Sequence, residues 1–475
     1  TRFNRLGANQ LSLRRLSAGC SDQTAIRIIL HQESLTSVGY FYSFENYQYG
    51  TKSLDGSIIM IQNLKNLFYR LLRRSESYTK TDMIFLARGG FWLVLGQVIS
   101  TISGFLFAIA FANLLPKETY GSYKYLLSLF ALLAIPTLSG IDTAMIKAVA
   151  QGSSGTILSA IKTKIKWGLL GSLLALAVAY YYNLIGQGEI SLGLLLMAVF
   201  LPFTDPLALY QTYYTGNKDF ITLSKNSSLI RIITVSIMLV ALYLTQNLIL
   251  LLIAFLLPLT LLRLYYFLQV KRNLNGKIDV ESIKFGKHLS IINIIAAVIN
   301  QIDKIIIFHY LGAVQLAVYS LATTPPEQIK GVLKHIETIS LAKFANRSLV
   351  EIKVSLHKRL WLLGGSILAI SLLYILGAPW IYRWFFPDYI ESVSYSQVFA
   401  LSLTAAVAVL PLTILQSKSA QHQLYLYKIY TSIVQLTAII TFIYTLGLWG
   451  AIIARVITRY ASLLIALLLL GRTKD

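Results

Sequence analysis

Long apolar blocks, each followed by a short polar turn, fill most of this chain. From residue 84 onward, glycine, proline and polar residues separate about twelve apolar stretches. A helix needs about 20 apolar residues to cross a hydrocarbon core about 30 Å thick. The pattern therefore predicts an all-α polytopic membrane protein with about twelve transmembrane helices. They are expected at 89–112, 122–146, 165–184, 190–213, 226–245, 247–270, 286–309, 314–340, 360–379, 394–416, 426–446 and 448–471.

The N-terminal part of the chain lacks this pattern. Residues 1–59 are polar and show no sustained period, so we expect a poorly ordered extension. The segment 60–83 places apolar and basic residues on opposite faces, which is typical of an amphipathic helix lying on a membrane surface. It begins with Met60, the first methionine, and we hypothesise that the natural protein starts there.

Composition excludes several classes of protein. Of the 475 residues, 56% are hydrophobic and 13% are charged, whereas about a quarter of a soluble domain is charged. The single cysteine, Cys20, excludes a disulfide framework and a cysteine-based metal site. The six histidines show no metal-binding spacing, and no catalytic or nucleotide-binding motif is present. We therefore expect neither a metal nor a cofactor.

The net charge of +22 reflects membrane topology. Most basic residues fall at the ends of predicted helices and form no soluble basic face, so nucleic acid is not an expected partner. If the helices alternate in direction, nearly all basic loops lie on one side, and the other side holds only Lys117 and Arg383. Because basic loops stay in the cytoplasm, both termini are predicted to be cytoplasmic.

An internal repeat relates the two halves of the chain. A shift of 196 residues aligns Gln97 with Asn293 and Arg263 with Arg459, among a series of glycine and polar matches. This predicts two six-helix bundles, 84–275 and 276–475, related by a pseudo-two-fold axis along the membrane normal. We expect them to face each other over a central cavity.

Charged residues occur inside several of the apolar stretches. Asp303 and Lys304 lie in the seventh predicted helix, and Glu327 and Lys330 lie in the eighth. A charge at the bilayer centre costs roughly 2.5–3.5 kcal/mol, so it usually marks a polar cavity or a transport route.

The twelfth predicted helix carries two arginines, Arg455 and Arg459, which are four residues apart and share one face. One interpretation makes them structural partners of Asp142, Asp205 or Asp303. The other makes them the lining of a basic cavity, because the planar guanidinium group matches the geometry of phosphate oxygens.

Prolines are expected to interrupt two helices. Asp205 lies between Pro202 and Pro206 in the fourth predicted helix, and Pro325-Pro326 falls within the eighth. Such bends are tolerated where they face protein or a wet cavity. They serve either as hinges or as static kinks.

Four segments resemble a known family. They are FANLLPKETYGSYKYLLSL (111–129), SGIDTAMIKAVA (139–150), NQIDKIIIFHYLGAVQLAVYSLA (300–322) and GLWGAIIAR (447–455). Over residues 84–471 the chain resembles bacterial polysaccharide or O-antigen flippases of the multidrug/oligosaccharidyl-lipid/polysaccharide exporter superfamily. Ala317 departs from the family pattern, where glycine is common.

The resemblance implies a transporter, not an enzyme. Its members flip polyprenyl-pyrophosphate-linked oligosaccharide across the bacterial cytoplasmic membrane by alternating access, for assembly of surface polysaccharide such as lipopolysaccharide O-antigen. Besides this cargo and membrane lipids, the expected partners are a polysaccharide polymerase and glycosyltransferases, and the protein itself is expected to be a monomer.

This function assigns roles to eight charged residues. The residues expected to bind the pyrophosphate and acidic sugars are Arg455, Arg459, Arg263, Lys304 and Lys330. Those expected to balance charge or couple transport to an ion are Asp303, Glu327 and Asp205.

Two other functions remain as alternatives. An ion-coupled drug or metabolite exporter of the same superfamily favours an acidic, aromatic cavity, and the excess of lysine and arginine argues against it. A membrane glycosyl polymerase or ligase is expected to carry its active site in a large external loop. The longest predicted external segment, 380–393, is too short for that.

Overall fold

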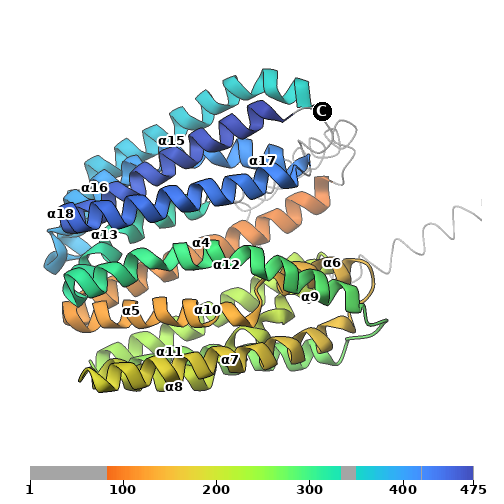
Figure 1. Cartoon of the computed structure of the whole chain (residues 1–475), viewed down its shortest axis with the longest axis horizontal. Helices are drawn as coiled ribbons and strands as arrows, with labels where there is room; N and C mark the ends of the chain where they lie inside the picture. The colour runs from red at the N-terminus through yellow and green to blue at the C-terminus, as the bar shows by residue number, and fades with distance from the viewer. Residues whose placement is uncertain (1–82, 333–348, 419, 474–475) are drawn as a thin grey trace, which may run out of the picture. The chain divides into compact units, whose positions relative to one another are not determined.

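The computed structural model describes residues 83–332, 349–418 and 420–473, and every regular element in these ranges is helical (Figure 1). The predictions for residues 1–82 lie outside the described residues. We call α4 to α11 the first half and α12 to α18 the second half. The first half contains α4 (Met83–Leu114), α5 (Lys117–Leu133), α6 (Gly140–Ala150), α7 (Thr156–Leu184), α8 (Gly188–Thr204), α9 (Tyr210–Gly216), α10 (Phe220–Leu244) and α11 (Leu248–Lys271). The second half contains α12 (Val280–Leu311), α13 (Ala313–Val332), α15 (Leu349–Phe385), α16 (Ser392–Leu401), α17 (Val409–Ser417) and α18 (Gln421–Arg472).

These helices correspond to the twelve predicted spans. Three spans are each built from two helices joined by a 3₁₀ turn: α5 with α6, α8 with α9, and α16 with α17. The turns are η1 (Ile135–Thr137), η2 (Pro206–Leu209) and η4 (Thr404–Ala408), and a fourth turn, η3 (Pro387–Tyr389), follows α15. The last two spans form α18, which is kinked at Gly447, where the backbone angles are not helical. The all-helical multi-pass fold is thus confirmed, whereas the boundary between bundles at residues 275 and 276 stays a prediction.

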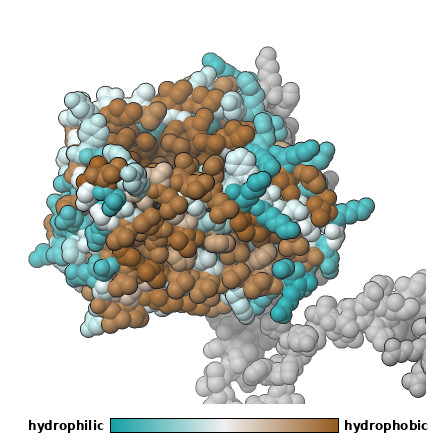
Figure 2. Space-filling view, turned by 60° about the horizontal axis from the view of Figure 1, so that its bottom comes forward, coloured by the Kyte–Doolittle hydropathy of each residue, from teal (hydrophilic) through white to brown (hydrophobic). Residues whose placement is uncertain are grey.

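The surface of the helical part matches a bilayer environment. Within the described ranges, nine helices are long and apolar enough to cross a membrane, or ten if the bent pair of α5 and α6 counts as one span. Figure 2 shows a broad hydrophobic surface with hydrophilic residues gathered at its edges. Large apolar side chains such as Leu173, Val199 and Leu373 are 63–70% exposed. Lipid acyl chains are as apolar as these side chains, so contact with lipid carries no hydrophobic cost.

Three helices begin at a capping side chain. Asp219 accepts a hydrogen bond from the Thr222 N–H at the start of α10, and Asn247 accepts one from Ile249 at the start of α11. At the start of α12, Asp279 accepts hydrogen bonds from the N–H and the hydroxyl of Ser282, which hold the pKa of its carboxyl below the usual value. Each cap satisfies a backbone donor that the first helical turn leaves free.

Glycines allow the two halves to pack closely. A Cβ atom on Gly121 of α5 would lie 1.8 Å from the carbonyl oxygen of Ala313, the first residue of α13. One on Gly140 of α6 would lie 2.4 Å from the backbone nitrogen of Ser290 in α12, whose hydroxyl also accepts a 2.9 Å hydrogen bond from the Gly140 N–H. Helices α5 and α6 therefore approach α12 and α13 to backbone contact, and Figure 1 shows α12 beside α5.

The second predicted span is bent rather than straight. Its two helices, α5 and α6, meet at an angle of 53°. The turn between them contains Pro136, which lacks an N–H donor, and Leu138, whose φ of 65° lies in the left-handed region. The sequence predicted one continuous helix over 122–146, and the break redirects α6 toward α12.

The prediction that Pro325-Pro326 interrupts the eighth helix is wrong, because α13 continues through both prolines. Pro325 cannot donate to the carbonyl of Leu321 four residues earlier. The hydroxyl of Tyr382 on α15 donates to this carbonyl instead, at 2.9 Å. A side chain about 60 positions later in the chain thus replaces the missing backbone bond, and the helix does not need to break.

The fourth span breaks at Pro206, whereas Pro202 lies inside α8. Helix α8 ends at Thr204 and the turn η2 begins at Pro206. Pro202 frees the carbonyl of Ala198, which accepts a 2.7 Å hydrogen bond from the Ser172 hydroxyl of α7. The break exposes the carbonyl of Thr204, and Arg263 of α11 donates to it at 2.7 Å.

A buried lysine ties the broken spans of the first half together. The side chain of Lys164 on α7 is 0% exposed, and its Nζ lies 2.6 Å from Asp142 Oδ1 and 2.9 Å from Asp205 Oδ2. The Thr137 hydroxyl donates to the same Asp205 oxygen at 2.6 Å. This cluster joins α6, α7 and the break after α8 through charge-assisted hydrogen bonds.

Replacing Lys164 by methionine should destabilise the protein. The lysine side chain has no solvent access, and its loss leaves two neighbouring carboxylates without their cation. The free energy of unfolding should fall by about 3 kcal/mol. Lys162→Met, on an exposed position of the same helix, should cost almost nothing. Thermal unfolding in detergent, followed by tryptophan fluorescence, measures both, and equal unfolding temperatures would contradict the structural role of Lys164.

Gly121→Leu should also destabilise the protein. Any side chain here must displace the backbone of α13, and overpacking of this kind costs about 1–3 kcal/mol or more. Gly365→Ala is the matched control, because no atom lies within 4 Å of the added Cβ and alanine favours a helix. Thermal unfolding should show a loss for Gly121→Leu and no loss for Gly365→Ala.

Candidate functional site

A buried carboxylate organises the charged residues of the second half. Asp303 of α12 has a side chain that is 0% exposed. Its Oδ2 atom accepts hydrogen bonds from Arg455 Nε at 2.9 Å, from Arg455 Nη2 at 2.6 Å and from the Tyr319 hydroxyl at 2.5 Å. Its other oxygen, Oδ1, has no partner among the described residues. The aspartate therefore joins α12, α13 and α18 at one point.

Arg459 lies one turn beyond Arg455 on α18 and has different partners. Its Nη2 forms an ion pair with Glu327 of α13, its Nη1 donates to the Ser402 hydroxyl at 2.8 Å, and its guanidinium lies 4.5 Å from the centre of the Phe399 ring. Glu327 also lies 3.8 Å from Lys330. The Glu327 side chain is 43% exposed, so this pair faces an opening, unlike Asp303.

Lys304 follows Asp303 in the chain and lies within the electrostatic range of Asp303 and Glu327, but it contacts neither carboxylate directly. Its Nζ donates to Gln301 at 3.1 Å, and it forms no ion pair with a described residue. Lys124 of α5 lies close enough to Lys304 and to Arg231 of α10 to be repelled by both positive charges. Neither Lys124 nor Arg231 has an ion-pair partner in the described ranges. Positive charge therefore accumulates where α5 and α10 of the first half meet α12 of the second.

These residues form a connected group that we call the interface cluster. The cluster contains six basic side chains and two carboxylates, which gives it a net charge of +4. Its members are Lys124, Arg231, Lys304, Lys330, Arg455, Arg459, Asp303 and Glu327. Because uncompensated charges are costly in a low-dielectric interior, the cluster suits an anionic ligand.

The structure brings six of the eight predicted residues together and leaves two elsewhere. Arg455, Arg459, Lys304, Lys330, Asp303 and Glu327 belong to the interface cluster. Asp205 instead pairs with Lys164, and Arg263 holds the carbonyl of Thr204. Of the two interpretations for the arginines, the structure shows the ion pair of Arg455 with Asp303, while Arg459 pairs with Glu327.

Two members of the cluster were not selected from the sequence. Lys124 shares the apolar stretch 122–146 with one other charge, Asp142, and Arg231 is the single charge in the stretch 226–245. The criterion that selected Asp303, a charge within a predicted span, applies to both of them. That criterion alone would have found them.

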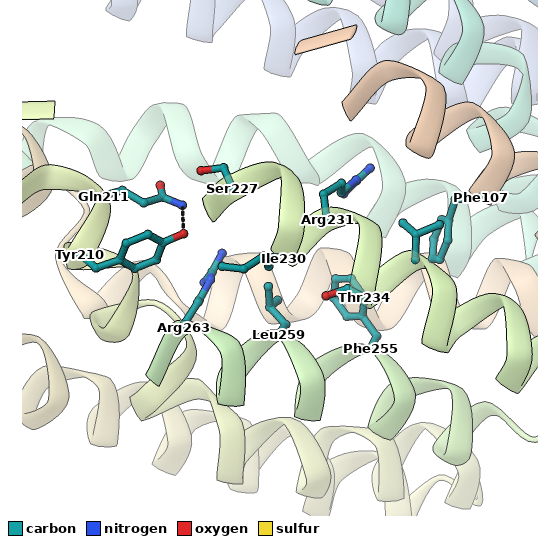
Figure 3. Close-up of a pocket in the computed structure, with 11 residues that line it drawn as sticks. Phe107, Tyr210, Gln211, Ser227, Ile230, Arg231, Thr234, Phe255, Leu259 and Arg263 are labelled. Carbon is teal, nitrogen blue, oxygen red and sulfur yellow. Dashed lines mark hydrogen bonds between the residues drawn. The ribbon is translucent and has the colours of Figure 1, made fainter. Parts of the chain in front are cut away.

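Arg263 and Arg231 line a cavity inside the first half (Figure 3). Its volume is about 250 Å³. The cavity lies among α4, α9, α10 and α11, and its lining comprises Phe107, Tyr210, Gln211, Ser227, Ile230, Arg231, Thr234, Val235, Phe255, Leu259 and Arg263.

Removing Arg455 should destabilise the second half. Arg455→Ala leaves the fully buried Asp303 carboxylate without its cation, which costs about 3–5 kcal/mol. The double variant Arg455→Ala/Asp303→Ala removes both charges and should recover part of this loss. Tryptophan-monitored thermal unfolding measures both. If the double variant unfolds at the temperature expected for two independent losses, the buried ion pair does not couple the two side chains.

Solved structures with a similar fold include a lipid II flippase and MOP superfamily transporters. A lipid II flippase, MurJ, in an inward closed conformation has a TM-score of 0.64 and 14% identity over 79% of this chain and 86% of its own. An inward-facing multidrug resistance MATE family transporter of the MOP superfamily has a TM-score of 0.60 and 14% identity over 80% and 96%. A MOP superfamily transporter from Pyrococcus furiosus, whose binding pocket has reversed polarity, has a TM-score of 0.56 and 14% identity over 81% and 94%. At these identities the similarity shows a shared fold.

Sequence comparison gives the family. No curated protein matches the chain significantly. The profile of one family, described as "Polysaccharide biosynthesis protein", matches residues 86–342, which is more than half of the chain. The matched range contains α4 to α13 with Asp303 and most of the interface cluster. The chain therefore belongs to the polysaccharide biosynthesis protein family.

Proposed function

We propose that this protein flips a polyprenyl-pyrophosphate-linked oligosaccharide across the cytoplasmic membrane. The observation that carries this proposal is the net positive interface cluster inside a transporter fold, in a member of a polysaccharide biosynthesis family. The fold is shared with a lipid II flippase. The proposal includes the orientation expected from the basic loops, with both termini in the cytoplasm.

The charges of the cluster fit a pyrophosphate head group. Lys124, Arg231 and Lys304 lack carboxylate partners among the described residues, so an anion with several negative charges would relieve their mutual repulsion. Lysine and arginine both bind phosphate oxygens through charge-assisted hydrogen bonds. The same charges would repel a cationic drug, which disfavours the drug exporter as an alternative.

The buried ion pair has a separate role in this proposal. The Nε and Nη2 atoms of Arg455 donate to Asp303, so Arg455 positions α18 rather than serving as the main cation for cargo. Arg459 and Lys330 share Glu327, which is partly exposed. Cargo phosphate would compete with Glu327 for these two cations. The carboxylates Asp303, Glu327 and Asp205 are the groups we propose for charge balance and ion coupling.

Contacts near the start of α5 hold the two halves together at one end of the helices. Lys117 at the start of α5 lies 2.6 Å from Glu391, just before α16. Asn113 at the end of α4 donates to the carbonyl of Phe385 at 2.8 Å, and Phe105 packs edge-on against Phe385 and Phe386. In the proposed cycle these contacts separate to release cargo. An exposed ion pair costs only about 0–1 kcal/mol to break, so this end can open readily.

Flipping in reconstituted vesicles tests the site. Lys304→Gln and Lys124→Gln should each slow flipping of a fluorescent polyprenyl-pyrophosphate oligosaccharide about tenfold or more, because each removes one charge-assisted hydrogen bond to the cargo. Both substitutions remove an unpaired cation, so the fold should survive. Lys162→Gln, at an exposed position of α7, is the control for a simple loss of charge.

Two outcomes would contradict the proposal. If the double variant Lys124→Gln/Lys304→Gln flips cargo at the wild-type rate, the interface cluster does not bind it. If wild-type vesicles move a cationic drug along an ion gradient and never move the lipid-linked oligosaccharide, the exporter alternative is correct.

A further inference from the structure

The cavity of the first half is separate from the buried Asp303 and Arg455 pair. It is formed by helices of the first half alone, and Figure 3 shows its side chains converging from α9, α10 and α11. Tyr210 and Gln211 lie at one end of the view, joined by a 3.2 Å hydrogen bond, and Phe107 lies at the other. Arg263, Thr234 and Arg231 lie between these ends. The proposed function uses Arg231 but gives no role to the cavity itself.

Several donors of the cavity have no partner. Thr234 is 4% exposed, and its hydroxyl makes no hydrogen bond with any described residue. The Nε atoms of Arg231 and Arg263 are also buried and unpartnered within the described ranges. Buried donors are normally satisfied, so three unsatisfied groups around one cavity point to an acceptor that binds there. None of the described lining residues is acidic, so an anion would meet no repulsion.

The remaining lining residues fit a sugar ring. Phe107, Phe255 and Tyr210 present aromatic side chains, and Ser227 and Gln211 offer polar groups suited to hydroxyls. The volume of about 250 Å³ is below the range of about 300–1,000 Å³ that is typical for drug-sized ligands. One monosaccharide unit is therefore a better fit than a whole oligosaccharide.

We infer that this cavity binds one sugar unit that carries an oxyanion, with its carboxylate or phosphate facing Arg231 and Arg263. The inference rests on the proposed function, because that unit would belong to the transported oligosaccharide. The planar guanidinium fork matches both carboxylate and phosphate oxygens. The hydroxyl of Thr234 supplies a third donor.

The cavity adjoins the surface where the two halves meet. A Cβ atom added to Gly104 of α4 would lie 3.3 Å from Arg231 Nη2 and 2.8 Å from Gln328 Nε2 of α13. Arg231 and Gln328 therefore approach the same point on α4 from the two halves. Arg231 also lies within electrostatic range of Lys124. Arg231 thus belongs both to the cavity and to the interface cluster. A head group could place its pyrophosphate at the cluster while an acidic sugar occupies the cavity.

Binding of free sugars to the purified full-length protein tests this inference apart from transport. Saturation-transfer NMR with glucuronate, glucose 1-phosphate, glucose and inorganic phosphate distinguishes the ligand chemistries. Glucuronate or glucose 1-phosphate should bind about tenfold or more tightly than glucose. Arg231→Gln should weaken that binding about tenfold or more, and Thr234→Val should weaken it by a smaller factor. Lys162→Gln should bind like the wild type.

The inference is overturned if glucose binds as tightly as glucuronate and glucose 1-phosphate, or if no sugar binds. Inorganic phosphate that binds as tightly as glucose 1-phosphate would show an anion site without sugar recognition and would also overturn it. Wild-type binding by Arg231→Gln has the same consequence. If Arg231→Gln does not fold, as judged by its thermal unfolding, Thr234→Val decides. Flipping does not enter these measurements, so wild-type protein that binds glucuronate and glucose 1-phosphate as expected but does not flip the lipid-linked oligosaccharide would count only against the proposed function.

Discussion

The second half of this protein depends on the burial of one carboxylate. Asp303 has no solvent access, so its charge must be compensated by groups that the fold itself supplies. Arg455 and Tyr319 reach it from two other helices, which fixes the relative positions of α12, α13 and α18. The buried charge of the first half is a lysine, Lys164, which contacts the carboxylates of Asp142 and Asp205. Each half is therefore organised by a buried charge, of opposite sign in the two halves.

The ion pairs of Asp303 and Lys164 use carboxylates within each half. Basic residues between the two halves are left without an ion-pair partner among the described residues. Arg455 and Tyr319 both bind Oδ2 of Asp303, and neighbouring Lys304 donates to an amide oxygen instead of forming an ion pair with this carboxylate. Lys124 and Arg231 approach it from the first half without a carboxylate of their own. The surface between the halves is therefore the most cationic part of the described interior. The positions of the few carboxylates in the chain therefore determine both the ion pairs within each half and the excess positive charge between the halves.

The sequence was sufficient for the positions of the helices and for six members of the interface cluster, because apolar length and buried charge are local properties of the chain. It could not show how prolines would act. Pro206 coincides with a break in the fourth span, whereas Pro325-Pro326 leaves α13 unbroken, since Tyr382 reaches the freed carbonyl from a distant helix. It also could not choose the partner of Arg455 among three aspartates. Both depend on contacts between segments that are far apart in the chain.

The single residue between the last two spans has a mechanical consequence. Gly447 has φ 58° and ψ −130°, a conformation that only glycine adopts readily, and no loop separates the spans it joins. Three residues later, Gly450 lies so close to the Phe442 carbonyl that a Cβ atom would be 1.7 Å from it. Because no loop separates the two spans, the final span moves as a unit when the backbone rotates at Gly447. A torsional change at Gly447 therefore swings Arg455 and Arg459 together, which links the corner to both ion pairs.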